Sequence, residues 1–333
     1  MRKIAFLDGL PGHLGTDIVT LGHMMAETDL FSDRALANLI ESYPRDQVLV
    51  SLLGPQGAVI SGWCRTDLAG LNGRSVLQAI RAGCYCIKLE HLERHAPIYG
   101  ALVTAGFDEI ERATPRLRVL QRESSLLISP PGASFACHAD VPLVCRWQMR
   151  GEKQMWLYPA DRLHNWSQRR REAMIVSGVE ARVGQEAAWD SAATRYTLRA
   201  GRAVCWPINA PHRAMNGSGL NVSISSKFFT PETLRMRDIY LANAYLRRWF
   251  GIAPAAPSAD GAGNAAKRLL AKGLVAMGVH RPRARRLGAP QRSIALVSAP
   301  HETGAPTCGR ATDRSQPASL PHVCAVTACA VRH

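Results

Sequence analysis

The chain lacks several features that would assign it quickly to a functional class. Its 333 residues contain no uninterrupted apolar run of 18 residues, so no segment predicts a membrane-spanning helix. The apolar part of the opening stretch is broken by Asp8 and Gly9 too early for a convincing signal peptide. Aromatic residues make up only 6%, but 47% of the residues are hydrophobic, which is enough for a sizeable core. We therefore expect a globular, soluble, cytoplasmic protein without a membrane partner.

Acidic residues are also scarce, with 26 Asp and Glu against 41 Lys and Arg and a net charge of +15. Residues 251–333 contain 11 Lys and Arg but 3 Asp and Glu, so about half of the excess lies in this tail. The rest of the chain is mildly basic and shows no nucleic-acid-binding module, so we do not expect a nucleic-acid partner. The nine cysteines lack metal-finger spacing, and in a reducing cytosol we expect most of them to be small buried hydrophobes.

One short pattern indicates a metal site. His138 and Asp140 are two residues apart, so in an extended strand their side chains point to the same face. His212 follows a proline at the end of another apolar run and is the candidate third ligand. A lone His-x-Asp is more often structural, and only its context gives it weight. Two imidazoles and a carboxylate leave open coordination positions, which suits Fe(II) that also holds a cosubstrate and oxygen. We predict that these three residues bind metal and form the catalytic centre.

The surrounding motifs supply that context, and they resemble the JmjC-type, cupin-like Fe(II)/2-oxoglutarate oxygenases over residues 15–245. The matching motifs are Pro131-Gly132-Ala133, His138-Ala139-Asp140, Arg150-Gly151-Glu152-Lys153, Leu157-Tyr158-Pro159 and the stretch from Leu198 to Asn216. The resemblance implies a mainly β fold with a double-stranded β-helix (cupin or jelly-roll) barrel, a helical N-terminal shell and a C-terminal helix. It also implies Fe(II) and 2-oxoglutarate as cofactors, oxygen as cosubstrate, and hydroxylation or demethylation as the reaction.

The same resemblance assigns residues to the cosubstrate. Lys153 lies 15 residues after His138, where relatives carry the lysine that pairs with the distal carboxylate of 2-oxoglutarate. Two positions depart from the pattern: Phe135 replaces a common threonine, and Val144 stands where a polar asparagine often occurs. We expect Ser134, with Ser129 as a further candidate, to compensate as a cofactor-binding residue. Lys227, on the last predicted strand, is a second basic candidate.

The hydrophobic pattern divides the chain into three regions. Residues 1–122 alternate short helices and strands, as expected for the N-terminal shell. Residues 123–250 contain short β-rich runs separated by Gly, Pro or Asn, then a helix that Thr230 caps and Pro231 begins. The apolar stripe of that helix must be buried on the barrel or in a homodimer. Residues 251–333 form a basic tail that we expect to be largely disordered, apart from a short helix between Asn264 and Met277.

Three alternatives stay open at this stage. Gly9, Gly12 and Gly15 invite a dinucleotide loop, but their spacing and context favour a flexible turn. A cupin-like binding or regulatory module without oxygenase activity is the rival function, motivated by Phe135 and Val144. The substrate is a protein side chain or a small metabolite. The insertion from His164 to Thr194 contains Arg169-Arg170-Arg171, which predicts an anionic group on that substrate.

Overall fold

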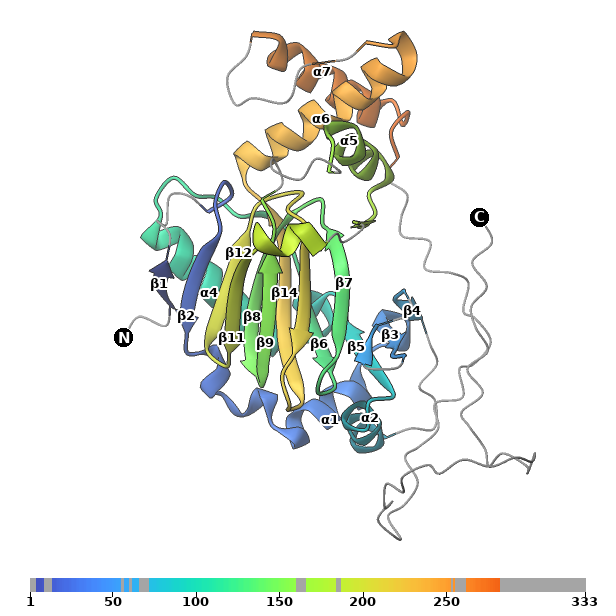
Figure 1. The fold of residues 1–333 in the computed structure, drawn as a ribbon. Coiled ribbons are helices and arrows are strands. Elements are labelled where there is room, and N and C mark those ends of the chain that lie inside the picture. Colours follow the sequence, from blue (N-terminus) through green and yellow to red (C-terminus); the bar gives the residue numbers. More distant parts are fainter. Residues whose placement is uncertain are drawn as a thin grey trace, which may run out of the picture.

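The computed structural model describes residues 4–8, 14–54, 57–59, 62–65, 72–159, 166–183, 187–252, 254 and 262–281. Two antiparallel sheets form its centre, with α1 and α2 at one end and α5, α6 and α7 at the other (Figure 1). Within these residues no helix is both long and apolar enough to cross a membrane. Most of the predicted disordered tail, as well as Gly9 and Gly12, lies outside the described residues.

The larger sheet has nine strands. In spatial order they are β1 (Ile4–Asp8), β2 (Val19–His23), β12 (Arg202–Trp206), β8 (Leu143–Arg150), β14 (Asn221–Phe229), β6 (Leu120–Ser129), β5 (Tyr85–Leu89), β3 (Val48–Leu52) and β4 (Cys64–Arg65). The smaller sheet has five, in the order β10 (Ala181–Arg182), β7 (Ser134–Ala139), β13 (His212–Asn216), β9 (Glu152–Leu157) and β11 (Thr194–Arg199). From β6 to β9 and from β11 to β14 the chain alternates between the sheets, with the topology of a double-stranded β-helix. This confirms the predicted fold class.

The N-terminal elements extend the larger sheet as well as covering it. β1 and β2 continue it beyond β12, and β5, β3 and β4 continue it beyond β6. The helices of this region are α1 (Asp33–Ser42), α2 (Gly73–Arg81), α3 (Leu92–His95) and α4 (Pro97–Ala113). Ser32 caps α1, because its Oγ accepts a hydrogen bond from the amide of Ala35 over 3.3 Å. The shell and the barrel therefore share one sheet.

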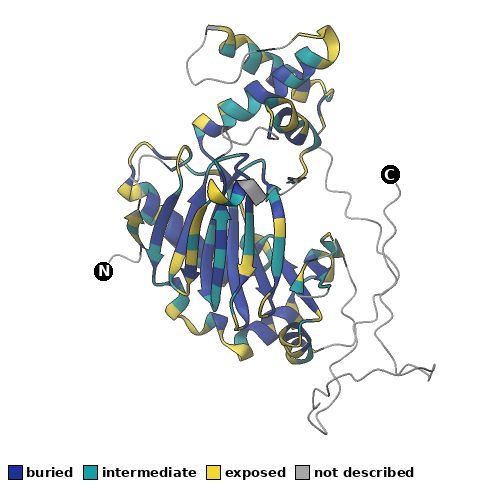
Figure 2. Ribbon diagram, viewed as in Figure 1, coloured by how far each residue is buried: buried dark blue, intermediate teal, exposed yellow. Residues whose placement is uncertain are grey.

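Strand alternation gives the larger sheet two different faces. On β8, Cys145 and Trp147 belong to the main core between the sheet and the helices, whereas Val144 packs between the two sheets. Burial is accordingly deepest along the central strands, as Figure 2 shows. Arg146 lies on the same inner side as Val144, because it is two residues further along the strand. The space between the sheets is thus lined by both apolar and charged side chains.

The C-terminal helices pack on one another above the sheets. They are α5 (Gln168–Ser177), α6 (Pro231–Phe250) and α7 (Ala262–Ala276). Thr230 and Pro231 begin α6 as predicted, with Thr230 Oγ1 accepting from the amide of Thr233. Part of the apolar stripe of α6 is buried against α5 and α7, through Leu241 and Tyr245. Its last two residues before the C-cap remain exposed.

The cysteines follow the prediction only in part. Cys86 and Cys137 are free and buried, as expected, but Cys84 is exposed. Cys145 on β8 and Cys205 on β12 form a disulfide, which had not been predicted. The pairing could not be found from their separation of 60 residues, because it depends on the two strands lying side by side in register.

Candidate metal centre

Two neighbouring strands of the smaller sheet bring the predicted ligands together. In the pairing of β7 with β13, His138 lies directly opposite His212, and their ring centroids are 4.2 Å apart. Asp140 follows immediately after β7, and its Oδ2 lies 3.6 Å from Nε2 of His212. One ligand atom from each of the three residues lies within 4.8 Å of the others. The sequence-predicted triad therefore converges on a single point.

The backbone selects which imidazole nitrogen is available. Nδ1 of His138 lies 2.9 Å from the carbonyl oxygen of Ala136, and Nδ1 of His212 lies 3.0 Å from that of Ala210. A carbonyl can only accept, so both Nδ1 atoms carry the proton and both Nε2 atoms keep a free lone pair. Nε2 of His212 is buried and has no hydrogen-bond partner among the described residues. An orphaned acceptor beside a carboxylate is what a divalent cation would satisfy.

The charge states also suit a metal. Burial lowers the pKa of His212 to about 3, so its imidazole is neutral at physiological pH. For Asp140, burial opposes ionisation, but the ammonium group of Lys227 and the two histidines outweigh it and lower the pKa. Metal ligands must be deprotonated, and these two already are. The residues present therefore fit a two-histidine, one-carboxylate metal site.

The partner of Asp140 on its other oxygen is Lys227 of β14. Its Nζ donates to Asp140 Oδ1 over 2.7 Å and lies 3.3 Å from Oε1 of Glu180. Lys227 was only a general basic candidate in the sequence, and its contact with a metal ligand was missed. The two residues are 87 positions apart and on different sheets, so no local pattern could have indicated the contact.

Lys153 lies at the floor of the same space, on the inner side of β9. It is only 2% exposed, and its Nζ donates to Oδ1 of Asn216 on β13. Asn216 is itself fixed by donating to Ser129 Oγ over 2.8 Å and to the carbonyl of Pro130 over 2.7 Å. Apart from the ring of Phe135, 5.1 Å away, Lys153 has no further partner in the described part of the chain. Its charge is therefore not balanced by a carboxylate.

The structure does not bring Ser134 together with the other predicted site residues. Ser134 is opposite Met215, which is exposed, and it does not line the cavity next to the triad. The reason is a bulge: between the pairs formed by His212 and Ala214, β7 uses one residue more than β13. This extra residue reverses the alternation, so Phe135 points inward where Ser134 was expected to. Val144 packs in the apolar cluster between the sheets and supplies no polar group, as its identity suggested.

A cavity of about 1020 Å³ opens beside the triad. It contains all three candidate ligands, together with Lys153, Lys227 and residues from both sheets and from α6 and α7. Its lining includes seven lysines and arginines but only four carboxylates, so it favours anionic ligands. One of the seven, Arg146, was not singled out in the sequence. The available signal was a charged residue at an inward position of a strand whose other residues are mostly buried.

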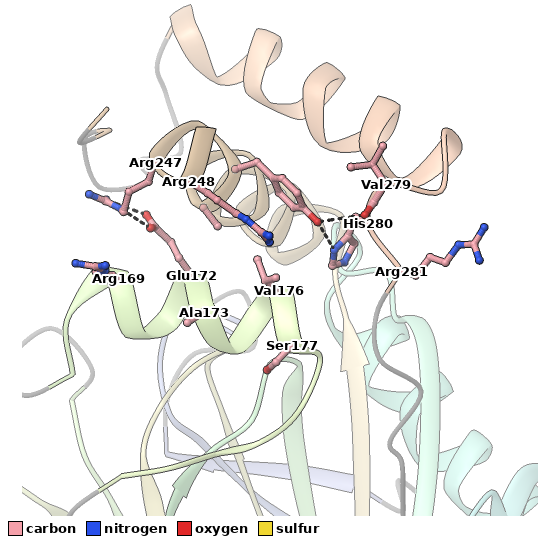
Figure 3. A pocket seen from close by; sticks show the side chains of 12 residues that line it. Arg169, Glu172, Ala173, Val176, Ser177, Arg247, Arg248, Val279, His280 and Arg281 are labelled. Carbon is pink, nitrogen blue, oxygen red and sulfur yellow. Dashed lines mark hydrogen bonds and ion pairs between the residues drawn. The ribbon is translucent and has the colours of Figure 1, made fainter. Parts of the chain in front are cut away.

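The predicted role of Arg169-Arg170-Arg171 at the barrel mouth is not supported. None of the three lines the metal cavity. Arg169 instead lies at a second cavity, of about 560 Å³, between α5, α6 and the residues after α7 (Figure 3). Arg171 donates to the carbonyl of Trp166 and to Tyr240, which fixes α5 on α6. The run lies along a helix, so its members point in different directions.

Comparisons with known proteins give structural likenesses at low sequence identity. No protein-family model and no curated protein matches the chain. The X-ray structure of Escherichia coli YcfD matches with a TM-score of 0.43 and 17% identity, over 85% of this chain and 70% of YcfD. A structure of E. coli YcfD, a ribosomal oxygenase, with cobalt and 2-oxoglutarate matches with a TM-score of 0.38 and 16% identity, over 77% of this chain and 60% of that one.

A third match is more partial. The DMSP lyase DddQ from Ruegeria pomeroyi DSS-3 matches with a TM-score of 0.21 and 11% identity, over 32% of this chain and 38% of the lyase. At these scores the matches describe a likeness of fold, and the chemistry has to be argued from this chain's own residues.

Proposed function

We propose that the chain is an Fe(II)- and 2-oxoglutarate-dependent dioxygenase that hydroxylates or demethylates its substrate. The observation that carries this proposal is the convergence of His138, Asp140 and His212 on the wall of a cavity that also contains an unbalanced buried lysine. A triad with open positions is suited to Fe(II), and Lys153 is suited to the distal carboxylate of a 2-oxo dicarboxylic acid. When bound, iron with 2-oxoglutarate would supply the oxidising chemistry.

The protein's own contribution is position, charge and exclusion of water. The carbonyls of Ala136 and Ala210 hold both imidazoles with Nε2 facing inward, and Lys227 holds one oxygen of Asp140. Trp206 packs against His212 with ring centroids 4.6 Å apart, which keeps one side of the site apolar. Preorganised ligands of this kind lower the cost of assembling the reactive complex.

The substrate follows from the cavity rather than from the arginine run. A cavity of about 1020 Å³ leaves room for a substrate group beyond a small dicarboxylate. Because cationic residues outnumber carboxylates in its lining, we propose a carboxylate-bearing substrate, either a protein side chain or a free metabolite. Mass spectrometry of lysate treated with wild-type or His138→Ala protein, searching for the gain of one oxygen atom, would identify it. A cationic product would contradict this part of the proposal.

Turnover of 2-oxoglutarate tests the proposal directly. Purified protein supplied with Fe(II), ascorbate and 2-oxoglutarate is expected to release succinate, and Asp140→Ala is expected to abolish that release. Asp108→Ala, which changes an exposed carboxylate on α4, is the matched control and should keep wild-type turnover. Equal succinate release by Asp140→Ala and wild type would rule out the triad as the catalytic centre.

A second candidate function has one observation in its favour. The aromatic ring of Phe135 faces the cavity where a polar group would help to hold 2-oxoglutarate. A cupin-like binding or regulatory module would bind the metal but not the cosubstrate. Calorimetry on anaerobic protein separates the two: iron binding without 2-oxoglutarate binding favours the module, whereas cosubstrate binding that is lost in Lys153→Ala favours the oxygenase.

A further inference from the structure

A polar row crosses the inner side of the larger sheet, facing Lys153 on the smaller sheet. Arg146 on β8 is paired with Ser225 on β14, and Ser225 is paired with Ser125 on β6. All three residues line the metal cavity. Inward positions of a barrel are normally filled by apolar side chains, and here three consecutive strands each contribute a hydrogen-bonding group instead.

Among the residues that the structure describes, the side chains of this row have no hydrogen-bond partners. Nε of Arg146 is inaccessible to solvent, and in the described part of the chain its guanidinium forms no hydrogen bond or ion pair. The hydroxyl groups of Ser125 and Ser225 also form no hydrogen bond with the residues that the structure describes. Arg146 is half-buried, and a guanidinium that is partly removed from water without a partner is destabilising, so folding alone does not explain its presence. A ligand with acceptor oxygens would satisfy all three groups.

The charge of Arg146 acts on groups at both ends of the cavity, Lys153 at one end and the triad at the other. The charge of Arg146 helps to lower the pKa of Lys153, whose value of about 7 results mainly from burial. The charge of Asp140 acts on Arg146, and that of Arg146 acts on His212. Arg146 therefore interacts electrostatically with both the triad and Lys153, with which it lines one cavity. The carboxylate of Asp140 is already engaged by Lys227, so the two interior cations share no dedicated counterion.

We propose that Arg146, with Ser225 and Ser125, forms a second carboxylate-binding subsite, so that the cavity holds a dicarboxylate by both ends. Lys153 binds the distal carboxylate, and Arg146 binds the carboxylate next to the triad. A guanidinium can donate two parallel hydrogen bonds to one carboxylate, and the serine hydroxyls supply further donors. This inference rests on the proposed function, because it takes 2-oxoglutarate as the dicarboxylate.

The test compares two ligands that differ only at the distal end. Anaerobic calorimetry on Mn(II)-loaded protein measures the binding of 2-oxoglutarate and of 2-oxopentanoate, which lacks the distal carboxylate. Lys153→Met is expected to lower the affinity for 2-oxoglutarate by about tenfold or more and to leave the affinity for 2-oxopentanoate nearly unchanged. Arg146→Met is expected to lower the affinity for both ligands by about tenfold or more, because both keep the carboxylate that Arg146 binds. Arg146→Lys should recover part of this loss.

Measuring the unfolding temperature shows whether a variant loses binding because it is unfolded. Because methionine removes an unpaired, half-buried charge at similar volume, Arg146→Met should unfold at or above the wild-type temperature. Wild-type affinity for both ligands in Arg146→Met would overturn the inference, and so would a loss confined to 2-oxoglutarate. Succinate is the third ligand: a wild-type protein that binds succinate but not 2-oxoglutarate contradicts the proposed function alone. Binding of neither dicarboxylate overturns both proposals.

Discussion

Lys227 and Asp140 are joined by a hydrogen bond of 2.7 Å that fixes which carboxylate oxygen faces the metal position. Nζ of Lys227 holds Oδ1, whereas Oδ2 lies 3.6 Å from Nε2 of His212. Asp140 is therefore arranged to offer one oxygen, not two. Groups that orient metal ligands in this way commonly affect metal binding almost as strongly as the ligands do.

Replacing Lys227 with methionine should weaken metal binding by roughly 10- to 100-fold. Loss of a nearby positive charge would by itself favour a cation, but Glu180 lies 3.3 Å from Lys227 and offsets much of that charge. We therefore expect the loss of orientation at Asp140 to dominate. Anaerobic titration with Fe(II) or Mn(II) measures the change. Lys272→Met, an exposed lysine on α7, is the control, and an affinity in Lys227→Met equal to this control would contradict the prediction.

Binding of 2-oxoglutarate should weaken as pH rises above about 7. Burial lowers the pKa of Lys153 to about 7, so the free protein loses the ammonium charge as pH passes that value. A bound carboxylate favours the protonated lysine, so binding above pH 7 must take up a proton. The dissociation constant should rise by up to about tenfold per pH unit above the pKa. Calorimetry in phosphate and in Tris, which differ in ionisation enthalpy, measures both affinity and proton uptake.

Arginine provides the matched variant for this prediction. Lys153→Arg keeps its charge at every pH of the experiment, so its affinity for 2-oxoglutarate should lose this dependence. Equal pH dependence in wild type and Lys153→Arg would mean that another group titrates. Geometry differs between the two side chains, so the comparison concerns the slope with pH and not the absolute affinity.

The predictable part of the site depended on short-range geometry and on motif context. His138 and Asp140 share a face because they are two residues apart, and His212 followed from the motif that precedes it. Lys153 followed from its distance from His138. Ser134 lies outside the cavity for a physical reason, because one extra residue in β7 reverses the alternation and turns Phe135 inward. A bulge of this kind depends on the pairing partner, which a single strand does not reveal.

The parts that were missed depend on contacts between distant strands. Arg146 becomes significant only because β8 lies beside β14 and faces Lys153 across the barrel. The contact of Lys227 with Asp140 joins two sheets. Arg169 was assigned to the barrel mouth because its charge was visible in sequence, but the helix that carries it directs it to another cavity (Figure 3). The positive charge of the arginine run was therefore not enough to predict which cavity it lines.

The contact between α1 and α2 should be very sensitive to the size of residue 73. A Cβ atom at Gly73 would lie 1.9 Å from the carbonyl oxygen of Ala37, which is backbone of α1 and cannot move aside. We expect Gly73→Ala to reduce the free energy of unfolding by about 3 kcal/mol or more, measured by urea denaturation. Gly219→Ala is the control, because a Cβ there meets no atom within 4 Å. Similar stability of the two variants would contradict the close approach of the helices.

Acid should destabilise the fold through His23. This residue is far in the sequence from the candidate metal ligands, and its ring packs on Trp147 with ring centroids 5.6 Å apart. Burial lowers the pKa of His23 from 6.5 to about 4, while the hydrogen bond with the carbonyl of Arg202 opposes the shift. Between these values the unfolded chain binds a proton that the folded chain does not. Stability is therefore complete above pH 6.5 and falls as pH decreases toward 4, by up to about 1.4 kcal/mol per pH unit from this residue.

Replacing His23 with glutamine keeps a donor for the carbonyl of Arg202 and removes the titrating group. The loss of stability between pH 7 and pH 5 should then be smaller than in wild type by about 2 kcal/mol. Urea unfolding at pH 7 and pH 5 gives the change in the free energy of unfolding for wild type and for the variant. Part of the acid sensitivity should persist in the variant, because burial also lowers the pKa of His212, to about 3, and acts in the same direction. If wild type and the variant lost the same unfolding free energy between pH 7 and pH 5, His23 would already exchange its proton freely in the folded protein.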